Sequence, residues 1–493
     1  MEKTSPGQTE TVSAVPVPYS IFTLRQKALI VTIVSVAATF SGFSSNIYFP
    51  AIPTIAIDLS VSPELINLTV TSYLIFQGLS PSIWGAVADV HGRRVTYIIT
   101  FIVYIGACIG LAETKHYYQL VILRCLQSTG SASTIAIGAG VVGDITRREE
   151  RGGYMGIYQA GLLSPVAVGP IIGGVFSQTL GWKAIFWFLT IFGGCFLLFL
   201  FLILPETLRS LVGNGSLPAK GLANSPLAYF QRRRLNRGDT SSASETPVVP
   251  SQRPSQKLPV NFLGPLQIIF GFEVTYIILF LGIGYTAWQV VITVMSTLFK
   301  KTYGLTDLQI GLTFISNGVG CIVGTLTTGR FLDWDYRRIK ENYTGPPEDF
   351  PLEYARLRTV WLWSGLECAT TLIFGWTLNY HVHISVPIIC TFFVGWSATS
   401  VISATTTYMV DVFPKQGASA TAALNLVRCL MAAGGTAAAL PIVNAIGVGW
   451  TFTLVVGLML GSLGLVVVQL QYGVKRRRRR ERREKEEAEE AKE

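Results

Sequence analysis

Three ionisable residues lie within stretches of this sequence that otherwise have no charge: Arg124, Glu367 and Arg428. A charged side chain near the centre of a bilayer costs at least ~2.5 kcal/mol, so it normally faces a cavity or a partner. Arg428 is predicted to lie near the middle of its span, where it would attract an anionic substrate or hold a carboxylate. Arg124 shares a helix face with Gln127, and it either faces the protein interior or extends to the headgroups. Glu367 is interpreted equally well as a proton carrier, a partner for an arginine, or a residue near a helix end.

A second group of charges occurs twice with the same spacing. Its members are Gly85, Asp89, Arg93 and Arg94, and then, 244 residues further along, Gly329, Asp333, Arg337 and Arg338. A weaker match follows two spans later in each half, where VVGDITRREERG contains Asp144 and YMVDVFPKQGAS contains Asp411. An insert at 341–358 explains the larger offset of this second pair. The duplication predicts two bundles that are related as parallel repeats.

The duplicated charges have the chemistry of a latch. Gly85 lets two helices approach closely, and Asp89 is able to accept hydrogen bonds at the N-terminus of a neighbouring helix. Arg93 and Arg94 are able to pair with carboxylates at the same membrane surface. We therefore predict that this set, together with Asp144 and the counterparts in the second half, closes in one conformation and opens in the other.

Uncharged polar residues within the predicted spans are candidates for a central substrate cavity. They are Asn46, Gln77, Gln159, Gln289, Asn317 and Asn425. The alternative for each of them, and the commoner role of a single such residue, is a hydrogen bond that joins two helices. Aromatic residues such as Tyr73 and Trp288 are able to stack on a flat substrate, although most of them pack helices together or lie at membrane interfaces.

The elements that must position these residues are membrane helices. Of the 493 residues, 50% are hydrophobic and only 14% are charged, and the mean hydropathy is +0.45. Soluble domains have roughly a quarter charged residues, and a helix needs about 20 apolar residues to cross a bilayer. The runs without charge, or with one interior charge, predict an all-α membrane protein with about twelve spans in two pseudo-symmetric bundles of six helices.

This pattern divides the chain into five parts. They are an N-terminal tail at 1–27, a six-helix bundle at 28–208, a linker at 209–267, a second six-helix bundle at 268–474, and a charged tail at 475–493. The middle of the linker is rich in Ser, Pro and Arg and has few large apolar residues, so most of it is predicted to be disordered. The basic residues of the tail directly follow the last span, where contact with anionic lipid headgroups is favoured over nucleic-acid binding.

Basic residues predict which side of the membrane each loop faces, because short loops rich in Lys and Arg stay in the cytoplasm. One set of loops contains Arg93, Arg94, Arg147, Arg148, Arg151, Arg330, Arg337, Arg338, Lys340 and Lys415, and the other contains Lys115, Lys183, Lys300 and Lys301. Both termini are therefore predicted to be cytoplasmic.

Cysteines and catalytic motifs give no sign of an enzyme. All seven cysteines lie inside predicted spans without paired spacing or a ligand cluster, so we expect neither a disulfide framework nor a metal site. The sequence has no nucleotide-binding loop and no nucleophile motif. These observations argue against an enzyme, against a cofactor and against ATP as the direct energy source.

Three motifs resemble those of the major facilitator superfamily. The charged loop from Gly85 to Arg94, with Gly92 in it, is similar to that family's loop signature, and RCLQSTGSAS, which begins at Arg124, is similar to its fourth-helix motif. GPIIGG resembles the fifth-helix motif of the family's antiporters, in which proline kinks the helix and glycines flatten one face. The residues of this motif are Gly169, Pro170, Gly173 and Gly174. The resemblance implies that Arg124, with Gln127, couples transport to protons, whereas Glu367 matches no family motif and stays a candidate proton carrier.

Further strings resemble the fungal twelve-span drug:proton antiporters, in particular the quinidine-resistance and citrate-exporter group. They are SSNIYFPAIP, AIGAGVVGDIT, LPETLR and NLVRCLMAAGG. This resemblance implies proton-driven export of an organic acid, a secondary metabolite or toxin, or a drug across the plasma membrane by a single chain. The alternative is an importer or uniporter of sugars or other nutrients with the same fold, since LPETLR is faintly similar to sugar porters. A membrane receptor or scaffold would leave the duplicated loops without a purpose.

Overall fold

The computed structural model describes residues 19–147, 150–215, 217, 221–226, 264–271, 274–345, 350–413 and 417–490. Every regular element within these ranges is a helix. The N-terminal tail up to residue 18 and the centre of the predicted linker, 227–263, lie outside the described residues, so the prediction of disorder there is not addressed.

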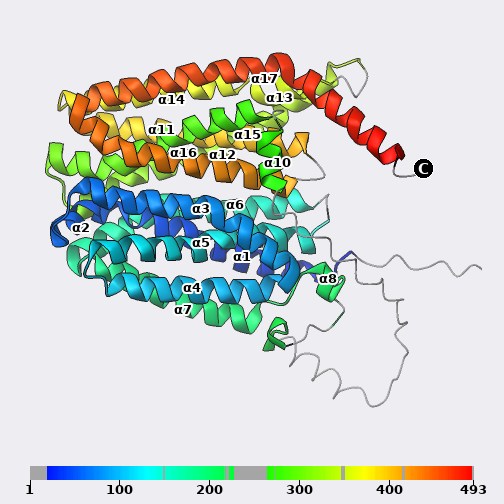
Figure 1. The fold of residues 1–493 in the computed structure, drawn as a ribbon, viewed down its shortest axis with the longest axis horizontal. Coiled ribbons are helices and arrows are strands. Elements are labelled where there is room, and N and C mark those ends of the chain that lie inside the picture. Colours follow the sequence, from blue (N-terminus) through cyan, green and yellow to red (C-terminus); the bar gives the residue numbers. More distant parts are fainter. Residues whose placement is uncertain are drawn as a thin grey trace, which may run out of the picture.

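The first half of the chain contributes six long helices that lie side by side (Figure 1). They are α1 (Leu24–Asn46), α3 (Pro63–His91), α4 (Arg93–Ala112), α5 (Tyr117–Ile145), α6 (Arg151–Thr179) and α7 (Lys183–Ile203). Between α1 and α3 the chain forms the short helices η1 (Phe49–Ala51) and α2 (Ile52–Asp58). Side-chain caps fix two of the starts, since Thr23 accepts a hydrogen bond at the N-terminus of α1 and Ser62 does so at α3.

The second half repeats this arrangement. Its long helices are α11 (Thr275–Tyr303), α12 (Asp307–Glu341), α14 (Val360–Asn379), α15 (Ser385–Val412), α16 (Gly417–Ile446) and α17 (Val448–Glu490). Short helices flank them: α8 (Arg209–Val212), η2 (Gly221–Ala223), α10 (Gly264–Phe270) and α13 (Leu352–Leu357). Ten of the helical segments in the described part are long and apolar enough to cross a membrane, and α3 and α14, with 29 and 20 residues, pack among them. The predicted all-α fold with two six-helix bundles is therefore confirmed.

The two ends of the helix bundle differ in what they hold. One end, called here the linker end, holds α8, α10, α13 and both ends of the described chain; the opposite end, called the far end, holds α2 (Figure 1). At the linker end α17 continues to Glu490, and its Arg477 pairs with Glu353 of α13 (Nε to Oε1, 3.2 Å). Arg480 donates a hydrogen bond to the Val412 carbonyl (2.6 Å). Part of the basic tail thus packs against protein.

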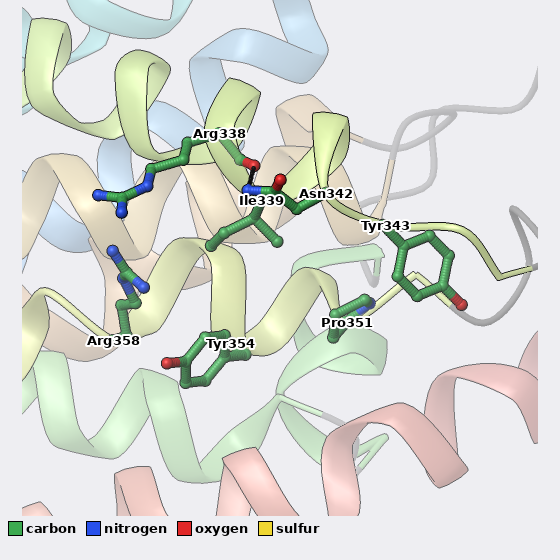
Figure 2. A pocket seen from close by; sticks show the side chains of 7 residues that line it. All are labelled: Arg338, Ile339, Asn342, Tyr343, Pro351, Tyr354 and Arg358. Atoms are coloured by element: carbon green, nitrogen blue, oxygen red, sulfur yellow. Dashed lines mark hydrogen bonds between the residues drawn. The ribbon is translucent and has the colours of Figure 1, made fainter.

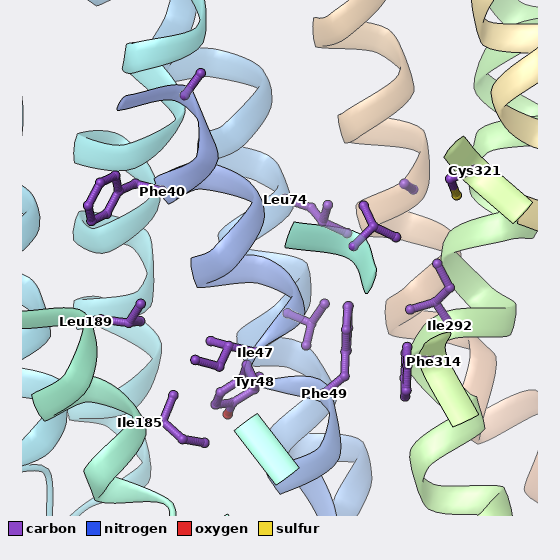
Figure 3. Close-up of a cluster of buried hydrophobic side chains, with 14 of the residues drawn as sticks. Phe40, Ile47, Tyr48, Phe49, Leu74, Ile185, Leu189, Ile292, Phe314 and Cys321 are labelled. Carbon is purple, nitrogen blue, oxygen red and sulfur yellow. The ribbon is translucent and has the colours of Figure 1, made fainter. Parts of the chain in front are cut away.

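The halves meet along two helix pairs, α6 against α12 and α3 against α16. Small residues permit the close approach: a Cβ at Gly318 would overlap Ala167 of α6, and a Cβ at Gly78 would lie 3.0 Å from Cys429. An apolar core runs across the boundary, where the rings of Phe49 and Phe314 stack with centroids 5.9 Å apart (Figure 3). The second long helix of each half therefore packs against the fifth long helix of the other half.

Candidate functional site

Arg124 lies fully buried inside the first half, on α5. Its guanidinium lies between the rings of Tyr48 and Tyr73, 4.4 Å from each centroid. It donates hydrogen bonds to the Ser44 carbonyl (2.8 Å) and to Gln127 Oε1 (2.7 Å), so the predicted partner on the next turn is in contact. Within the described residues no carboxylate lies within 4 Å of this cation, and its Nε has no hydrogen-bond partner. Such a buried cation is held by π faces and neutral oxygens and is able to receive an anion.

We call Tyr48, Tyr73, Ser44 and Gln127 the cage around Arg124. A chain of polar contacts leads from this cage to the second half. The Tyr73 hydroxyl donates to the Ser41 carbonyl (3.0 Å), and Gln77 Nε2 donates to Ser41 Oγ (3.3 Å). Asn425 of α16 then donates to the Gln77 carbonyl (3.1 Å), and its Oδ1 accepts from Arg428 Nε (3.2 Å). We call these contacts the polar path, because they connect the two arginines through α1, α3 and α16.

Arg428 is half-buried at the interface between the halves. Its guanidinium lies 4.9 Å from the ring centroid of Tyr285 and donates a second hydrogen bond to Asn425 Oδ1 from Nη2 (2.9 Å). No acidic side chain of the described part lies within 4 Å of it. The two halves therefore each place one guanidinium, without a carboxylate partner, at opposite ends of the polar path.

The other predicted cavity residues are spread more widely. Asn317 is buried on α12 and accepts a hydrogen bond from Trp288 Nε1 (3.1 Å), and Gln289 is buried on α11. Asn46 bonds within its own helix to the Gly42 carbonyl (2.8 Å). Gln159 is exposed on α6. Of the six predicted residues, the structure joins only Gln77 and Asn425 to the polar path.

Glu367 is buried on α14, with 1% of its surface exposed. Its Oε1 has no hydrogen-bond partner, and a Cβ on Gly284 of α11 would lie 3.8 Å from Oε2. No cation of the described residues lies within 4 Å of this carboxyl. A carboxyl in this setting must bind a proton or meet a cation, because an isolated buried charge is costly. The structure does not bring it into contact with Arg124 or Arg428.

The first charged loop forms a compact cluster at the linker end. Arg93 pairs with Asp89 (Nη1 to Oδ1, 2.7 Å) and with Asp144 (Nε to Oδ2, 3.1 Å). Gly92, with φ of 104°, lets α3 stop and α4 start at once, and a Cβ there would lie 2.5 Å from Glu206 Oε2. The Glu206 carboxylate caps α4 by accepting the N–H groups of Arg93 (2.9 Å) and of the next residue (3.2 Å).

Arg94 has a different role from its neighbour. It is fully buried and donates to carbonyls at the C-terminal end of α7: Leu200 (3.4 Å), Phe201 and Leu204. Glu206, which follows α7, therefore caps α4, and Arg94 of α4 caps α7, so that these contacts hold the two helices together. Glu206 was not predicted from the sequence, although it lies inside the LPETLR string.

The second charged loop is built differently. Asp411 pairs with Arg356 of α13 (2.8 Å), while Asp333, Arg337 and Arg338 are exposed on α12. The reason is that Tyr336 occupies the position that matches Gly92, so α12 does not stop but continues to Glu341. The insert then supplies α13, and Arg356 occupies the place beside Asp411 that Arg93 occupies beside Asp144. The missing glycine was the sequence signal for this difference.

The GPIIGG motif packs α6 against two neighbours. A Cβ at Gly169 would lie 3.3 Å from Asn46 and Ile47 at the end of α1, and one at Gly173 would overlap the Ile47 carbonyl. A Cβ at Gly174 would lie 2.6 Å from the Asp307 carbonyl oxygen. Pro170 lies inside α6. Its carbonyl oxygen packs so closely on Gly311 of α12 that a Cβ at Gly311 would overlap it. The motif therefore permits contact between the halves at the far end.

Asp307 joins the halves at the far end. Its Oδ2 accepts hydrogen bonds from Thr54 (2.6 Å) and Ser177 (2.6 Å) of the first half, and its Oδ1 pairs with Lys300 (3.2 Å). Nearby, the Leu308 N–H donates to Gln178 Oε1 (3.2 Å). We call these contacts the far-end clasp; they hold this end closed in the present conformation.

Replacing Asp307 with alanine should open the far end. The loss of hydrogen bonds to a charged group is worth about 1.5–3 kcal/mol, so the open-to-closed ratio should rise at least about tenfold. Spin labels on cysteines at exposed Glu113 and Tyr380 would report the distance between the halves. Asp58→Asn is the matched control, because Asp58 accepts a hydrogen bond from Trp182 (2.9 Å) within one half. Equal distance distributions for Asp307→Ala and Asp58→Asn would contradict the clasp.

Comparisons with known proteins agree with this architecture. The family model of the Major Facilitator Superfamily matches residues 34–435. Citrate exporter 1 of Aspergillus niger is 40% identical over 485 residues, which cover 95% of this chain and 90% of the relative. The MFS antiporter QDR2 of Candida albicans is 37% identical, with 92% of this chain and 90% of the relative covered.

A solved structure of the human organic anion transporter MFSD10 (TETRAN) has a TM-score of 0.55 and covers 89% of this chain and 99% of its own, at 18% identity, which shows the fold alone. The predicted resemblance to the quinidine-resistance and citrate-exporter group is confirmed by the two fungal relatives. The chain is therefore a transmembrane transport protein that belongs to the Major Facilitator Superfamily.

Proposed function

We propose that this protein is a proton-coupled exporter that binds a small organic anion between its halves and releases it outside the cell by alternating access. The observation that carries the proposal is the polar path with a carboxylate-free guanidinium at each end, Arg124 in the first half and Arg428 in the second. A guanidinium prefers a carboxylate or phosphate partner, and a substrate with acidic groups supplies one. The relatives named as a citrate exporter and an antiporter support export and antiport.

The orientation of the chain in the membrane follows from the charge pattern. Arg93 and Arg94 start α4, and Arg337 and Arg338 lie in the last turns of α12, so these basic residues are at the linker end. This end is therefore the cytoplasmic one under the rule for short loops, and both termini are cytoplasmic. The far-end clasp then closes the outer side, so the structure corresponds to the state that loads substrate from the cytoplasm. The plasma membrane is the membrane in which such an exporter acts.

Proton coupling is assigned to the cage around Arg124 and, as a second candidate, to Glu367. Within the described residues the Arg124 cation has no carboxylate partner, so an anionic substrate and a carboxylate that has released its proton would compete for it. Glu367 is the buried carboxyl in the second half that is able to take up the proton. The two linker-end clusters, Arg93 with Asp89 and Asp144 and Arg356 with Asp411, act as latches that exchange partners when that end closes.

Transport in proteoliposomes tests the proposal. The full chain, inserted with the linker end outward, should accumulate radiolabelled citrate or another organic acid when the lumen is acidic, and a protonophore should abolish the accumulation. Empty liposomes are the control for leak. Accumulation that is independent of the pH gradient would refute proton coupling, and transport of a cationic dye without any organic acid would refute the anionic substrate.

A further inference from the structure

A surface pocket of about 390 Å³ lies at the linker end of the second half, away from the polar path (Figure 2). It is formed by the last turns of α12 and by the segment that contains α13. Its polar lining residues are Arg338, Asn342, Tyr343, Tyr354 and Arg358. None of them takes part in the transport site described above.

The described residues that line the pocket have an excess of positive charge. The guanidinium groups of Arg338 and Arg358 extend toward each other from the two elements (Figure 2). Arg358 pairs with the fully buried Asp335, and the Tyr354 hydroxyl, followed by Asp335, raises the pKa of Arg358. Arg338 lies over the Trp334 ring at 5.4 Å and, within the described residues, is more than 4 Å from any carboxylate. Among the described residues, Arg338 therefore has no anion beside it, and like charges that face each other favour an anion between them.

Exposed aromatic residues locate the pocket at the depth of the lipid headgroups. Trp334 is 53% exposed, and its ring contacts that of the exposed Phe331 on α12 with centroids 5.8 Å apart. Tyr354 on α13 is 51% exposed. Trp and Tyr are enriched at membrane interfaces, where the ring contacts lipid and the polar edge contacts headgroups. These residues flank the guanidinium groups, so the pocket opens where phosphates of the leaflet are present.

We propose that this pocket binds the phosphate of an anionic phospholipid in the leaflet at the linker end, with the guanidinium groups of Arg338 and Arg358 as its donors. The planar guanidinium matches phosphate geometry, and a negatively charged leaflet attracts such a site. The inference depends on the placement of the chain in a membrane but not on the substrate or on the proton coupling proposed above.

Binding at this pocket has a structural consequence for the second half. The short helix α13 supplies Tyr354 to the pocket, and it also supplies Glu353, which pairs with Arg477, and Arg356, which pairs with Asp411. A lipid that joins the end of α12 to α13 therefore stabilises the position of the Arg356–Asp411 latch. Lipid binding and closure of the linker end are linked through this helix.

Native mass spectrometry of the purified full chain tests the proposal. With phosphatidylserine added in detergent, we expect a retained lipid adduct, and with phosphatidylcholine a much weaker one. Arg338→Gln should lower phosphatidylserine affinity at least about tenfold, because it removes a charged hydrogen bond. Arg337→Gln is the matched control: it removes the same charge from the exposed neighbouring position that does not line the pocket, and it should change affinity less than about twofold.

Three outcomes would overturn the assignment. Equal losses of phosphatidylserine affinity in Arg338→Gln and Arg337→Gln would show that the lipid responds to general surface charge and not to this pocket. Equal retention of phosphatidylcholine would show that the pocket does not select an anionic headgroup. Displacement of the lipid by millimolar inorganic phosphate would assign the pocket to a soluble phosphate instead. Because Arg338 is exposed, its variant should keep the thermal unfolding midpoint of the parent protein, and a transport assay is not needed for any of these arms.

Discussion

Arg124→Ala should lower gradient-driven export at least about a hundredfold. The wild-type guanidinium makes two hydrogen bonds, to Ser44 and Gln127, and two cation–π contacts, to Tyr48 and Tyr73. Each hydrogen bond to a charged group is worth about 1.5–3 kcal/mol, and 1.4 kcal/mol corresponds to a factor of ten. The measurement is the initial rate of organic-acid uptake into proteoliposomes under an imposed pH gradient.

Arg124→Lys is the control that separates charge from shape. Lysine keeps the charge but has no planar guanidinium to stack between the rings of Tyr48 and Tyr73. We expect part of the transport rate to return and coupling to stay weak. An Arg124→Ala protein that still accumulates substrate at the parent rate, and still stops when a protonophore is added, would show that Arg124 has no part in coupling.

Arg428→Gln should weaken binding of anionic substrates about ten- to a hundredfold and leave cationic ones nearly unchanged. The half-buried guanidinium makes its hydrogen bonds to Asn425 and lies over Tyr285, so its charge is available to a ligand between the halves. Charge-assisted bonds to a carboxylate are stronger than neutral ones. Competition by a tricarboxylate, a monocarboxylate and a cationic dye measures the three affinities in one protein.

Asn425→Asp offers a matched test that leaves Arg428 in place. The new carboxylate would pair with the guanidinium and occupy the partner that the substrate is expected to provide. Anion affinity should therefore fall as it does in Arg428→Gln, whereas binding of the cationic dye should improve. A loss of equal size for all three ligands in both variants would mean that Arg428 supports packing and not an anion site.

The fold was accessible from the sequence because a bilayer imposes a simple constraint. A spanning helix satisfies its own backbone hydrogen bonds and must be apolar for about 20 residues, so runs without charge locate the helices before any tertiary contact is known. The repeat of Gly85 and Asp89 at Gly329 and Asp333 was sufficient to predict two related halves. Helix ends could be predicted less well from the sequence. The bundles were predicted to begin at residue 28 and end at residue 474, whereas α1 starts at Leu24 and α17 continues to Glu490.

The candidate site was accessible only in part. A lone arginine in an apolar run is conspicuous, and both Arg124 and Arg428 were identified in this way. Gln127 was predicted beside Arg124, and Gln77 and Asn425 were predicted as candidate cavity residues. Ser41 and Ser44 were not predicted, because they resemble any other small helix residue. The prediction from the repeat was wrong for the second latch. Arg356, which pairs with Asp411 in place of Arg337 or Arg338, comes from an insert that has no counterpart in the first half.

The sequence by itself determined the membrane class, the number of long helices, the duplication and the identity of the two arginines within spans, because hydropathy and charge are local properties of the chain. Tertiary structure alone decided that the guanidinium of Arg124 lies between Tyr48 and Tyr73, and that Gln77 meets Asn425 across the interface. Those contacts join residues that are up to 348 positions apart. Their geometry depends on how α3 packs against α16, which no local pattern in the sequence specifies.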